Sequence, residues 1–556
     1  MKHEYRVVVS GAGVAGLTFT AELLRQGIDP NDILLIDNQP SKRKFTKASV
    51  LHLRVQEILS CYDLTEKMQA YGNWITSASI ISNGSVLNTN HLQLPLYSKH
   101  KGYIGTEQWL VEQTLLDYIT SKGGQVYWST EIQDFDQGDL IQARVKHNNE
   151  IKTVTTQYLV GSEGGKSTIR KHLGLSFVGE SGPLAVAVHF KGDKLKHTDE
   201  NTLNIYGNST GVALSMGMPN GNWMVGMDVS TAEVEEYLSE SKDHHGQYYF
   251  DKEMPDSFLS KLIQKKLDPD FTGFDAVIWK SGYRIQNRIV DKFGNGKNIF
   301  LIGDAAHLTS PQSGSGMNYA IYDGNNLGWK LAMVLQKLAL PVILDTFEQE
   351  RRDATQALLQ VTKQIDQLTT SLTTMSLFGK SVLSTMLKLP PFTILQEYQR
   401  LFGHGFSLTY KSLLSCDTYS TFLTSAYEKV YFDGQYGVGQ RFNPCTLDFI
   451  KERFLTETSG FKVVYFADSI DTLEYAQRNT EYLLNKIKQV TDVVVVPLTR
   501  RDIYSTCKID KGIMVIRPDG FVGLKTRELS FGSIAKYFNS FCPQLHTVDP
   551  TSIFYN

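Results

Sequence analysis

The chain has 556 residues, more than one hydrophobic core usually holds, so we expect two or three domains. Its 56 basic and 58 acidic residues give a formal net charge of -2, which offers no overall attraction for nucleic acid or an anionic membrane. No run of about 18 apolar residues supports a transmembrane helix, and the five scattered cysteines predict neither a disulfide framework nor a metal site.

Residues 6–10 form the first predicted element, a strand with three consecutive valines of the kind buried in parallel sheets. It ends at a turn of the form G-x-G-x-x-G, which opens a predicted helix. The first glycine permits the tight turn, the second lets a pyrophosphate approach the backbone, and the third allows close packing of the helix on the strand. The turn comprises Gly11, Ala12, Gly13, Val14, Ala15 and Gly16.

The second predicted strand, residues 33–36, ends in Asp37. A carboxylate at this place can accept hydrogen bonds from the ribose hydroxyls of an adenosine. A glycine trio alone is as often an ordinary loop, but strand, helix and acid in this order favour a dinucleotide site. The pattern leaves FAD and NAD open.

A basic loop at residues 41–47 comes next, followed by a helical pattern. Such charge runs more often form a solvated surface than a binding site. Because this one follows the ribose acid directly, Lys47 and Arg54 are candidate phosphate contacts. Gln108 then lies in a further predicted helix, residues 106–121.

Alternation of apolar and polar residues over 125–158 predicts a small antiparallel excursion that returns to the sheet at 157–162. The turn Glu163-Gly164-Gly165 then leads into a short helix. Residues 184–281 alternate again and carry turn signals, which predicts an antiparallel sheet inserted into the nucleotide domain. We expect this sheet to form a wall for a second ligand.

A buried strand is predicted at 298–303, followed by Gly303-Asp304-Ala305-Ala306-His307 and a glycine-rich loop that enters a long helix. Small residues permit close approach to a flat ring, and a helix N-terminus at 316–318 can stabilise negative charge there. Residues 345–430 read as helical. Beyond 434 the order of strand, helix and three strands predicts a separate small α/β domain.

Together these stretches resemble the FAD-dependent aromatic hydroxylases, single-component flavoprotein monooxygenases of the para-hydroxybenzoate hydroxylase type. The most specific one is GKNIFLIGDAAHLTSPQSGSGMNYAIYDGNNLGWKL, residues 296–331. A later stretch, GIMVIRPDGFVGLK at 512–525, is similar to the end of the thioredoxin-like domain found in the phenol hydroxylase and polyketide hydroxylase branch.

The resemblance implies an α/β fold: a Rossmann-like FAD-binding domain with an inserted antiparallel β-sheet substrate domain and a C-terminal thioredoxin-like domain. We expect the boundaries to be 1–180 with 282–345, 181–281, a helical segment at 346–433, and 434–556. It also implies that Asp304 binds the ribitol or ribose chain, that Gln108 touches FAD, and that Glu163 belongs to a motif associated with both FAD and NADPH. The ring of the flavin would lie near Pro311, Gly314, Gly316, Met317 and Asn318.

Two departures from the family pattern concern charge: Lys47 stands where an arginine is usual, and Glu163 replaces an aspartate. The first keeps the charge but loses the bidentate fork. The C-terminal domain has no C-x-x-C, so we expect a structural or homodimer role for it rather than disulfide exchange.

By the same resemblance, NADPH or NADH reduces bound FAD, the reduced flavin captures O2 as a hydroperoxide, and oxygen passes to a phenolic or polyketide-like aromatic substrate. The sequence names no catalytic residue and no metal ligand. An epoxidase, a Baeyer-Villiger oxygenase and a halogenase are alternatives, the last disfavoured because W-x-W-x-I-P is missing. A flavoprotein that only binds an aromatic ligand is another. The glycine turn begins too early for a signal peptide, so we expect a cytoplasmic protein.

Overall fold

The computed structural model describes residues 1–42, 44, 48–82, 84–91, 101–196, 198–208, 211–240, 249–311, 314–374, 460–467, 469–487, 489–497, 512–526, 529 and 531–542. Their strands form four sheets, which we call the parallel, antiparallel, small and C-terminal sheets. Within these residues no helix has the length and apolar character needed to cross a membrane. No group of metal-binding side chains is assembled in the same part of the chain.

The parallel sheet is built from strands whose side chains are almost entirely buried. Its parallel part has the order β8-β2-β1-β11-β17, and β10 and β9 extend β11 as an antiparallel excursion, as the sequence predicts. The strands are β1 (Glu4–Ser10), β2 (Ile33–Ile36), β8 (Val126–Tyr127), β9 (Thr130–Asp136), β10 (Ile141–His147), β11 (Glu150–Gly161) and β17 (Ile299–Leu301).

Two glycines let the helices that follow β1 and β17 lie in contact. A Cβ on Gly324 of α8 (Gly316–Leu335) would stand 2.7 Å from the carbonyl oxygen of Ala15, and one on Gly328 would stand 2.7 Å from Glu22. Both partners lie on α1 (Val14–Arg25), so the two helices run in the same direction. Because Gly324 is eight residues into α8 yet faces the first turns of α1, α8 extends roughly 8 Å further at its N-terminal end.

The antiparallel sheet has the order β18-β16-β12-β15-β14-β13-β5-β6. Its strands are β5 (Ser77–Ser82), β6 (Ser85–His91), β12 (Phe177–Lys191), β13 (Thr202–Asn208), β14 (Gly211–Met218), β15 (Asn222–Val229), β16 (Ala276–Val290) and β18 (His307–Leu308). One expectation needs correction: residues 77–91, predicted as part of the first domain, pair with β13 in this sheet, and the β5–β13 pair is parallel. Local sequence could not show this, because the pairing joins Ser77 to Thr202.

Helices α6 (Thr231–Val234) and α7 (Asp256–Lys266) cover one face of this sheet. The small sheet, in the order β3-β7-β4, consists of Val50–Leu51, Tyr103–Gly105 and Asn73–Ile75. The remaining helices of this part are α2 (Leu53–Ser60), α3 (Thr65–Ala70), α4 (Gln108–Ser121), α5 (Thr168–His172) and α9 (Asp345–Thr374). Short 3-10 turns lie at Pro30–Asp32, Pro219–Gly221, Glu235–Tyr237, Gly303–Ala305 and Pro341–Leu344.

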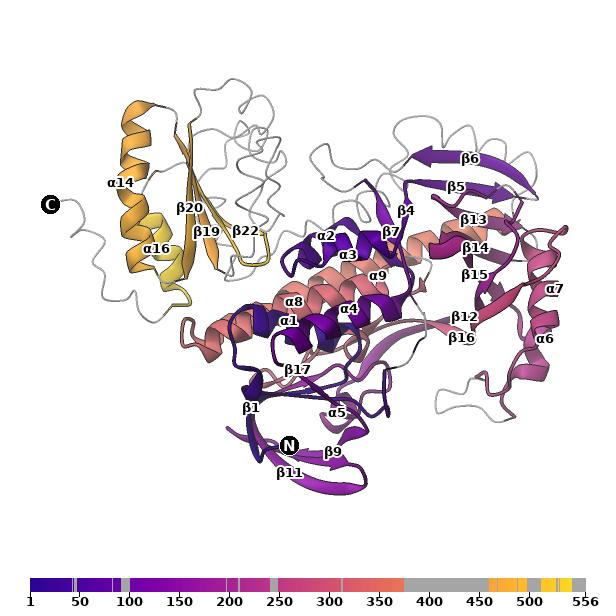
Figure 1. Ribbon diagram of the computed structural model, residues 1–556, viewed down its shortest axis with the longest axis horizontal. Coiled ribbons are helices and arrows are strands. Elements are labelled where there is room, and N and C mark those ends of the chain that lie inside the picture. Colours follow the sequence, from indigo (N-terminus) through magenta and orange to yellow (C-terminus); the bar gives the residue numbers. More distant parts are fainter. Residues whose placement is uncertain are drawn as a thin grey trace.

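The C-terminal sheet has the order β20-β19-β21-β22, with β19–β20 parallel and the other pairs antiparallel. The elements are β19 (Phe461–Ala467), α14 (Ile470–Lys486), β20 (Val490–Pro497), β21 (Gly512–Ile516), β22 (Val522–Thr526) and α16 (Phe531–Asn539). This is the predicted order of a thioredoxin-like domain, with α16 added. Figure 1 shows α8 and α9 between this domain and the antiparallel sheet.

Candidate functional site

The glycine turn after β1 is packed so tightly that two of its three glycines have no room for a side chain. Gly11 has φ +106°, and a Cβ there would stand 2.4 Å from the carbonyl oxygen of Ser162. A Cβ on Gly16 would stand 2.0 Å from the carbonyl oxygen of Gly11. These contacts hold α1 against the ends of β1 and β11.

Gly13 differs from its neighbours, because a Cβ there would meet no atom of the described residues within 4 Å. It is the N-cap of α1, and no side chain caps that helix end. The first turn of α1 therefore presents backbone N–H groups to open space, which is the arrangement that binds a phosphate.

Asp37 lies beside this turn, as predicted. Its Oδ2 accepts a 2.8 Å hydrogen bond from the backbone N–H of Ala12, and its Oδ1 accepts one of 2.8 Å from Gln39. Each carboxylate oxygen has a second lone pair, so the side chain can still accept hydrogen bonds from a ribose.

The second glycine-lined loop begins at Gly303, which has φ +59°. A Cβ on Gly303 would stand 2.8 Å from the Cβ of Ala15, so this loop lies directly against the first turn of α1. Asp304, the predicted sugar-binding acid, follows at an exposed position. The structure thus brings together the two loops that the sequence predicts to hold one ligand.

A buried carboxylate holds this second loop in place. Asp323 of α8 accepts hydrogen bonds from the backbone N–H of Gly303 at 2.9 Å, from Arg351 at 2.7 Å, and contacts His307 Nε2 at 2.6 Å. Burial raises the pKa of Asp323, but the charges of His307 and Arg351 outweigh it and hold this pKa below its usual range. His307 is therefore a structural residue of the loop.

The N-terminus of α8 is the other end of the site. Among the described residues no side chain caps it, and a Cβ on Gly316 would meet only Thr309 Oγ1 there, at 3.6 Å. That hydroxyl is buried and has no hydrogen-bond partner in the described part of the chain. Asn318 ties this end to β3: it accepts from the N–H of His52 at 2.8 Å and donates to Val50 O at 2.8 Å.

The predicted residues around Glu163 make a compact cap for α5. Glu163 accepts from the hydroxyls of Ser10 (2.9 Å) and Ser167 (2.7 Å) and from the N–H of Ile169 (3.0 Å). Arg170 donates to Ala305 O at 3.2 Å, which links this cap to the second loop. Contact of Glu163 with a cofactor stays a prediction.

Arg54 has different partners from those predicted. Its guanidinium contacts Glu57 and the backbone oxygen of Asp519 and lies 5.2 Å from the centre of the Phe521 ring, so it binds the C-terminal domain. These contacts give no support to a phosphate role. Lys47 lies outside the described residues.

The other predicted positions stay predictions with the following places. Gln108 opens α4 and donates to Glu112 at 2.8 Å, and Gly314 closes a turn onto Pro311 O at 2.9 Å. Pro311 is exposed and Met317 is buried.

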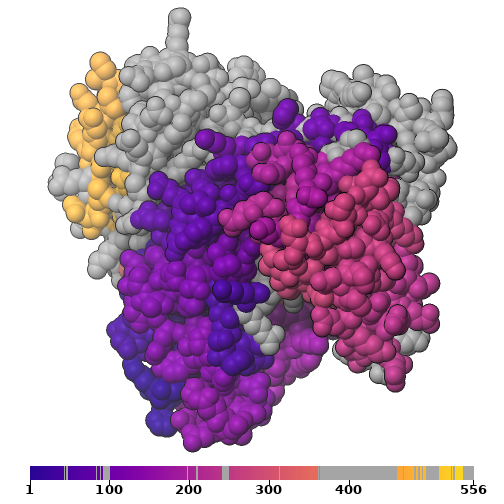
Figure 2. Space-filling model, turned by 45° about the vertical axis from the view of Figure 1, so that its right-hand side comes forward, coloured from indigo at the N-terminus to yellow at the C-terminus, as the bar shows by residue number. Residues whose placement is uncertain are grey.

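The antiparallel sheet offers a second surface. Its face away from α7 carries Ala187, flanked by Gly226 and Ser281, and a Cβ on Gly226 would meet nothing within 4 Å in the part of the chain that the structure describes. The half-buried Leu214 pairs with Gly226 on the next strand. This open, mostly apolar face fits the predicted wall for a second ligand. Figure 2 shows a hollow between the purple part of the first domain and the pink part of this one.

Comparison with known proteins decides what the first site binds. Residues 4–362 match the family described as FAD binding domain. The chain belongs to this family. The predictions of FAD as cofactor and of a FAD-dependent monooxygenase related to the aromatic hydroxylases are confirmed at the level of the family.

Its relatives are named as monooxygenases. A flavin-dependent monooxygenase of Mycobacteroides abscessus is 28% identical over 62% of this chain and 70% of its own length. The 6-methylpretetramide 4-monooxygenase of Streptomyces rimosus is 28% identical over 62% of this chain, and the match spans 59% of that protein. Pentachlorophenol 4-monooxygenase of Sphingobium chlorophenolicum is 25% identical over 65% of this chain and 64% of its own length.

Solved structures confirm the fold class. The flavin-dependent monooxygenase PieE, in complex with FAD and substrate, has a TM-score of 0.74 at 18% identity, with 97% of this chain and 99% of that chain covered. A ternary complex of aklavinone-11 hydroxylase with FAD and aklavinone has a TM-score of 0.71 at 20% identity, covering 97% and 98%.

The described residues fit FAD in three ways. Gly13 leaves open space at the N-terminus of α1, Asp37 keeps acceptor capacity beside it, and the unpartnered hydroxyl of Thr309 lies next to Gly316. Sequence reasoning missed Thr309 and Asp323. The second carried a signal, since a carboxylate inside an apolar helix next to a glycine loop needs buried partners.

Proposed function

We propose that the chain is an NAD(P)H-consuming, FAD-dependent monooxygenase that hydroxylates a phenolic or polyketide-like aromatic substrate. The observation that carries the proposal is the parallel packing of α1 and α8, with two uncapped helix ends on one side and the open face of the antiparallel sheet as a second surface. The names of the relatives, which include phenol and tetracycline monooxygenases, support the aromatic substrate class.

The side chains of this protein have binding and positioning tasks in such a reaction. The N–H groups of α1 would neutralise the pyrophosphate, and Asp37 and Asp304 would accept hydrogen bonds from the sugar and ribitol hydroxyls. The N-terminus of α8 would stabilise negative charge on the ring edge. FAD, when bound, supplies the redox and oxygen-transfer chemistry.

The wall formed by Ala187, Leu214 and Gly226 would hold a flat apolar substrate and exclude water. Water exclusion matters here because, in the presence of water, electrons from NAD(P)H can be lost as hydrogen peroxide and not used on the substrate. Met216 and Met218 lie on the same face of β14 as Leu214, where they pack in a buried cluster with Leu53, Ile75 and Tyr103 at the end of the wall.

The test is incubation of the FAD-loaded full chain with NADPH or NADH and a panel of phenols and polyphenolic polyketides. The proposal expects substrate-stimulated NAD(P)H loss and a product heavier by one oxygen atom. Oxygen inserted next to a ketone, oxygen added across an alkene, or halogen incorporation would instead identify a related flavoenzyme. FAD binding without substrate-stimulated NAD(P)H loss would identify a flavoprotein that only binds its ligand.

We also propose O2 as the oxygen donor, the cytoplasm as the location and a homodimer as the assembly. Oxygen consumption, cell fractionation and light scattering of the purified protein test these three points in turn. The domain boundaries given above, with residues 77–91 moved to the antiparallel-sheet domain, are likewise proposals that limited proteolysis checks.

A further inference from the structure

A cluster of buried charges joins the C-terminal domain to the helices behind the flavin site. Arg517 makes a two-point ion pair with Glu350 of α9, at 2.7 and 2.8 Å, and a 2.6 Å pair with Asp519. Lys330 of α8 completes the cluster, with its Nζ 2.8 Å from Glu350 Oε2. All four side chains are at most 2% exposed, so the cluster holds two cations and two anions away from water.

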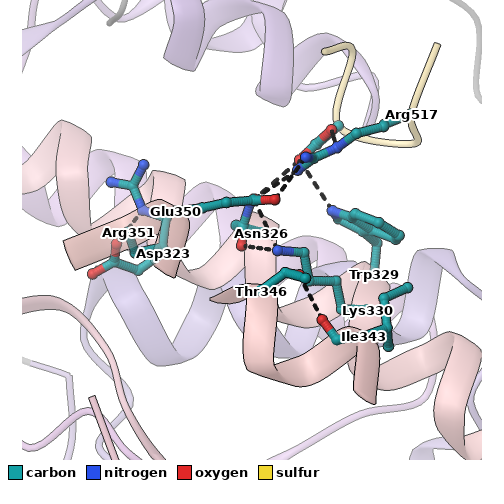
Figure 3. Close-up of polar contacts among 10 residues, drawn as sticks. Asp323, Asn326, Trp329, Lys330, Ile343, Thr346, Glu350, Arg351 and Arg517 are labelled. Carbon is teal, nitrogen blue, oxygen red and sulfur yellow. Dashed lines mark hydrogen bonds and ion pairs between the residues drawn. The ribbon is translucent and has the colours of Figure 1, made fainter. Parts of the chain in front are cut away.

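Neutral side chains of α8 fill the remaining hydrogen bonds of Asp519. Asn326 donates to Asp519 Oδ2 at 3.3 Å, and the ring N–H of Trp329 donates to the same oxygen at 3.2 Å. Figure 3 shows the labelled partners converging from α8, α9 and the turn that carries Arg517. Arg517 and Lys330 keep the pKa of Glu350 well below its usual range, although burial raises it.

The next residue of α9, Arg351, contacts the carboxylate that holds the second glycine loop. Arg351 donates to Asp323 at 2.7 Å, and Asp323 accepts the N–H of Gly303 and contacts His307. Neighbouring residues on a helix point about 100° apart, so one turn of α9 faces the C-terminal domain with Glu350 and the flavin loop with Arg351.

The same turn of the C-terminal domain reaches a second part of the site. Arg54 of α2 contacts the backbone oxygen of Asp519 and the ring of Phe521. Two residues before it, the N–H of His52 donates to Asn318 at the start of α8. Residues 517–521 therefore contact α2, α8 and α9, and residues of these helices or next to them hold the second glycine loop.

We propose that Arg517 is a positioning residue for the flavin, acting through Glu350 and Arg351 on Asp323 and the loop at Gly303. The C-terminal domain is then a working part of the flavin site, acting on it through α9. This proposal rests on FAD binding and is independent of the substrate proposed above.

The test uses substitutions that change the charge of the cluster and keep the shape of each side chain as close as possible to the original. Glu350→Gln leaves Arg517 and Lys330 opposite a single anion, so the contacts of α9 with the C-terminal domain loosen. Adding Lys330→Met to Glu350→Gln restores one cation and one anion. Glu233→Gln is the matched control, because Glu233 also lies between two lysines, Lys265 at 2.6 Å and Lys266 at 3.4 Å, but in the antiparallel-sheet domain.

Three readouts are taken on the full chain: the dissociation constant for FAD, the visible circular dichroism of the bound flavin, and Tm. We expect Glu350→Gln to raise the FAD dissociation constant about tenfold and to change the flavin spectrum. The double variant should recover most of both, whereas Glu233→Gln should lower Tm alone. None of these readouts needs turnover, so failure of the proposed activity leaves the test intact.

The proposal is overturned if Glu350→Gln lowers Tm like Glu233→Gln while affinity and spectrum stay as in the native chain. It is also overturned if the double variant recovers Tm but not FAD affinity. Should Glu350→Gln not fold, Arg517→Lys carries the test, since it keeps the charge and loses the fork. We expect a smaller shift in the same direction, and an unchanged spectrum and affinity would overturn the proposal.

Discussion

The flavin loops and the buried charge cluster hold the same helices by opposite means. At the loops the helices touch because side chains are missing: Gly16, Gly303 and Gly324 have no space for a Cβ. At the cluster they are joined by side chains that are long, charged and fully buried. The glycines at these contacts lie in short local patterns of small residues, whereas a cluster built from positions 330, 350, 517 and 519 leaves no such pattern. The glycine loops can therefore be predicted from the sequence, and the charge cluster cannot.

The largest effect on stability should come from the cluster. Arg517→Met leaves Glu350 and Asp519 buried with Lys330 as the only cation of the four, and an uncompensated buried charge costs about 3–5 kcal/mol. The free energy of unfolding in urea measures the loss. A loss below about 1 kcal/mol would mean that the cluster gives little to stability.

Adding a side chain to a tightly packed loop glycine should lower the free energy of unfolding by slightly less. A Cβ at position 16 would lie 2.0 Å from the Gly11 carbonyl and 2.6 Å from Ser162 Oγ, so the backbone must move. We expect Gly16→Ala to destabilise the FAD-free chain by about 3 kcal/mol. Urea unfolding of the FAD-free protein checks this, and an unchanged midpoint would contradict the close packing of α1.

Low pH tests a third kind of buried contact, a histidine between two domains. His189 lies at the contact between the two domains, 3.6 Å from Glu107 and 1% exposed, and burial lowers its pKa from 6.5 to about 4. Below pH 6.5 the unfolded chain takes up a proton that the folded chain resists, so stability falls as pH drops from 6.5 to 4, by up to about 3 kcal/mol.

Removing this group should flatten the acid response. His189→Gln is expected to lose less stability than the native chain between pH 6.5 and 4.5, measured by urea unfolding at each pH. His3→Gln, at an exposed position, is the control. Equal slopes for the native chain and His189→Gln would contradict a buried neutral histidine. His52, whose pKa burial lowers to about 3, extends the response to lower pH.

The smallest effect is expected at an exposed ion pair. Lys67 and Asp117 lie 2.8 Å apart, yet both side chains are more than a third exposed. Lys67→Ala should change the free energy of unfolding by at most about 0.5 kcal/mol. A loss as large as that of Arg517→Met would show that distance rather than burial sets the strength of these pairs.

Features that depend on local sequence could be predicted, and features that join distant positions could not. Sequence predicts four features of the molecule: the turn at Gly11, the acid at Asp37, the loop at Gly303 and the order of the C-terminal elements. Each of them is a local pattern of small residues, strands and turns. Arg54 is a predicted phosphate contact because of its place after the ribose acid, and local sequence cannot show its contact with Asp519, 465 residues away. Strands 77–91 were missed for the same reason, since only their pairing with β13 places them in the antiparallel sheet.

The central claim is that Gly13 faces the bound cofactor. FAD titration of the native chain and Gly13→Ala, with urea unfolding of both FAD-free proteins, tests it most directly. We predict that stability differs by no more than about 1 kcal/mol, because a Cβ at Gly13 meets no atom of the described residues, while FAD affinity falls about tenfold or more. A native chain that holds no FAD, or equal FAD affinity in both proteins, would contradict it.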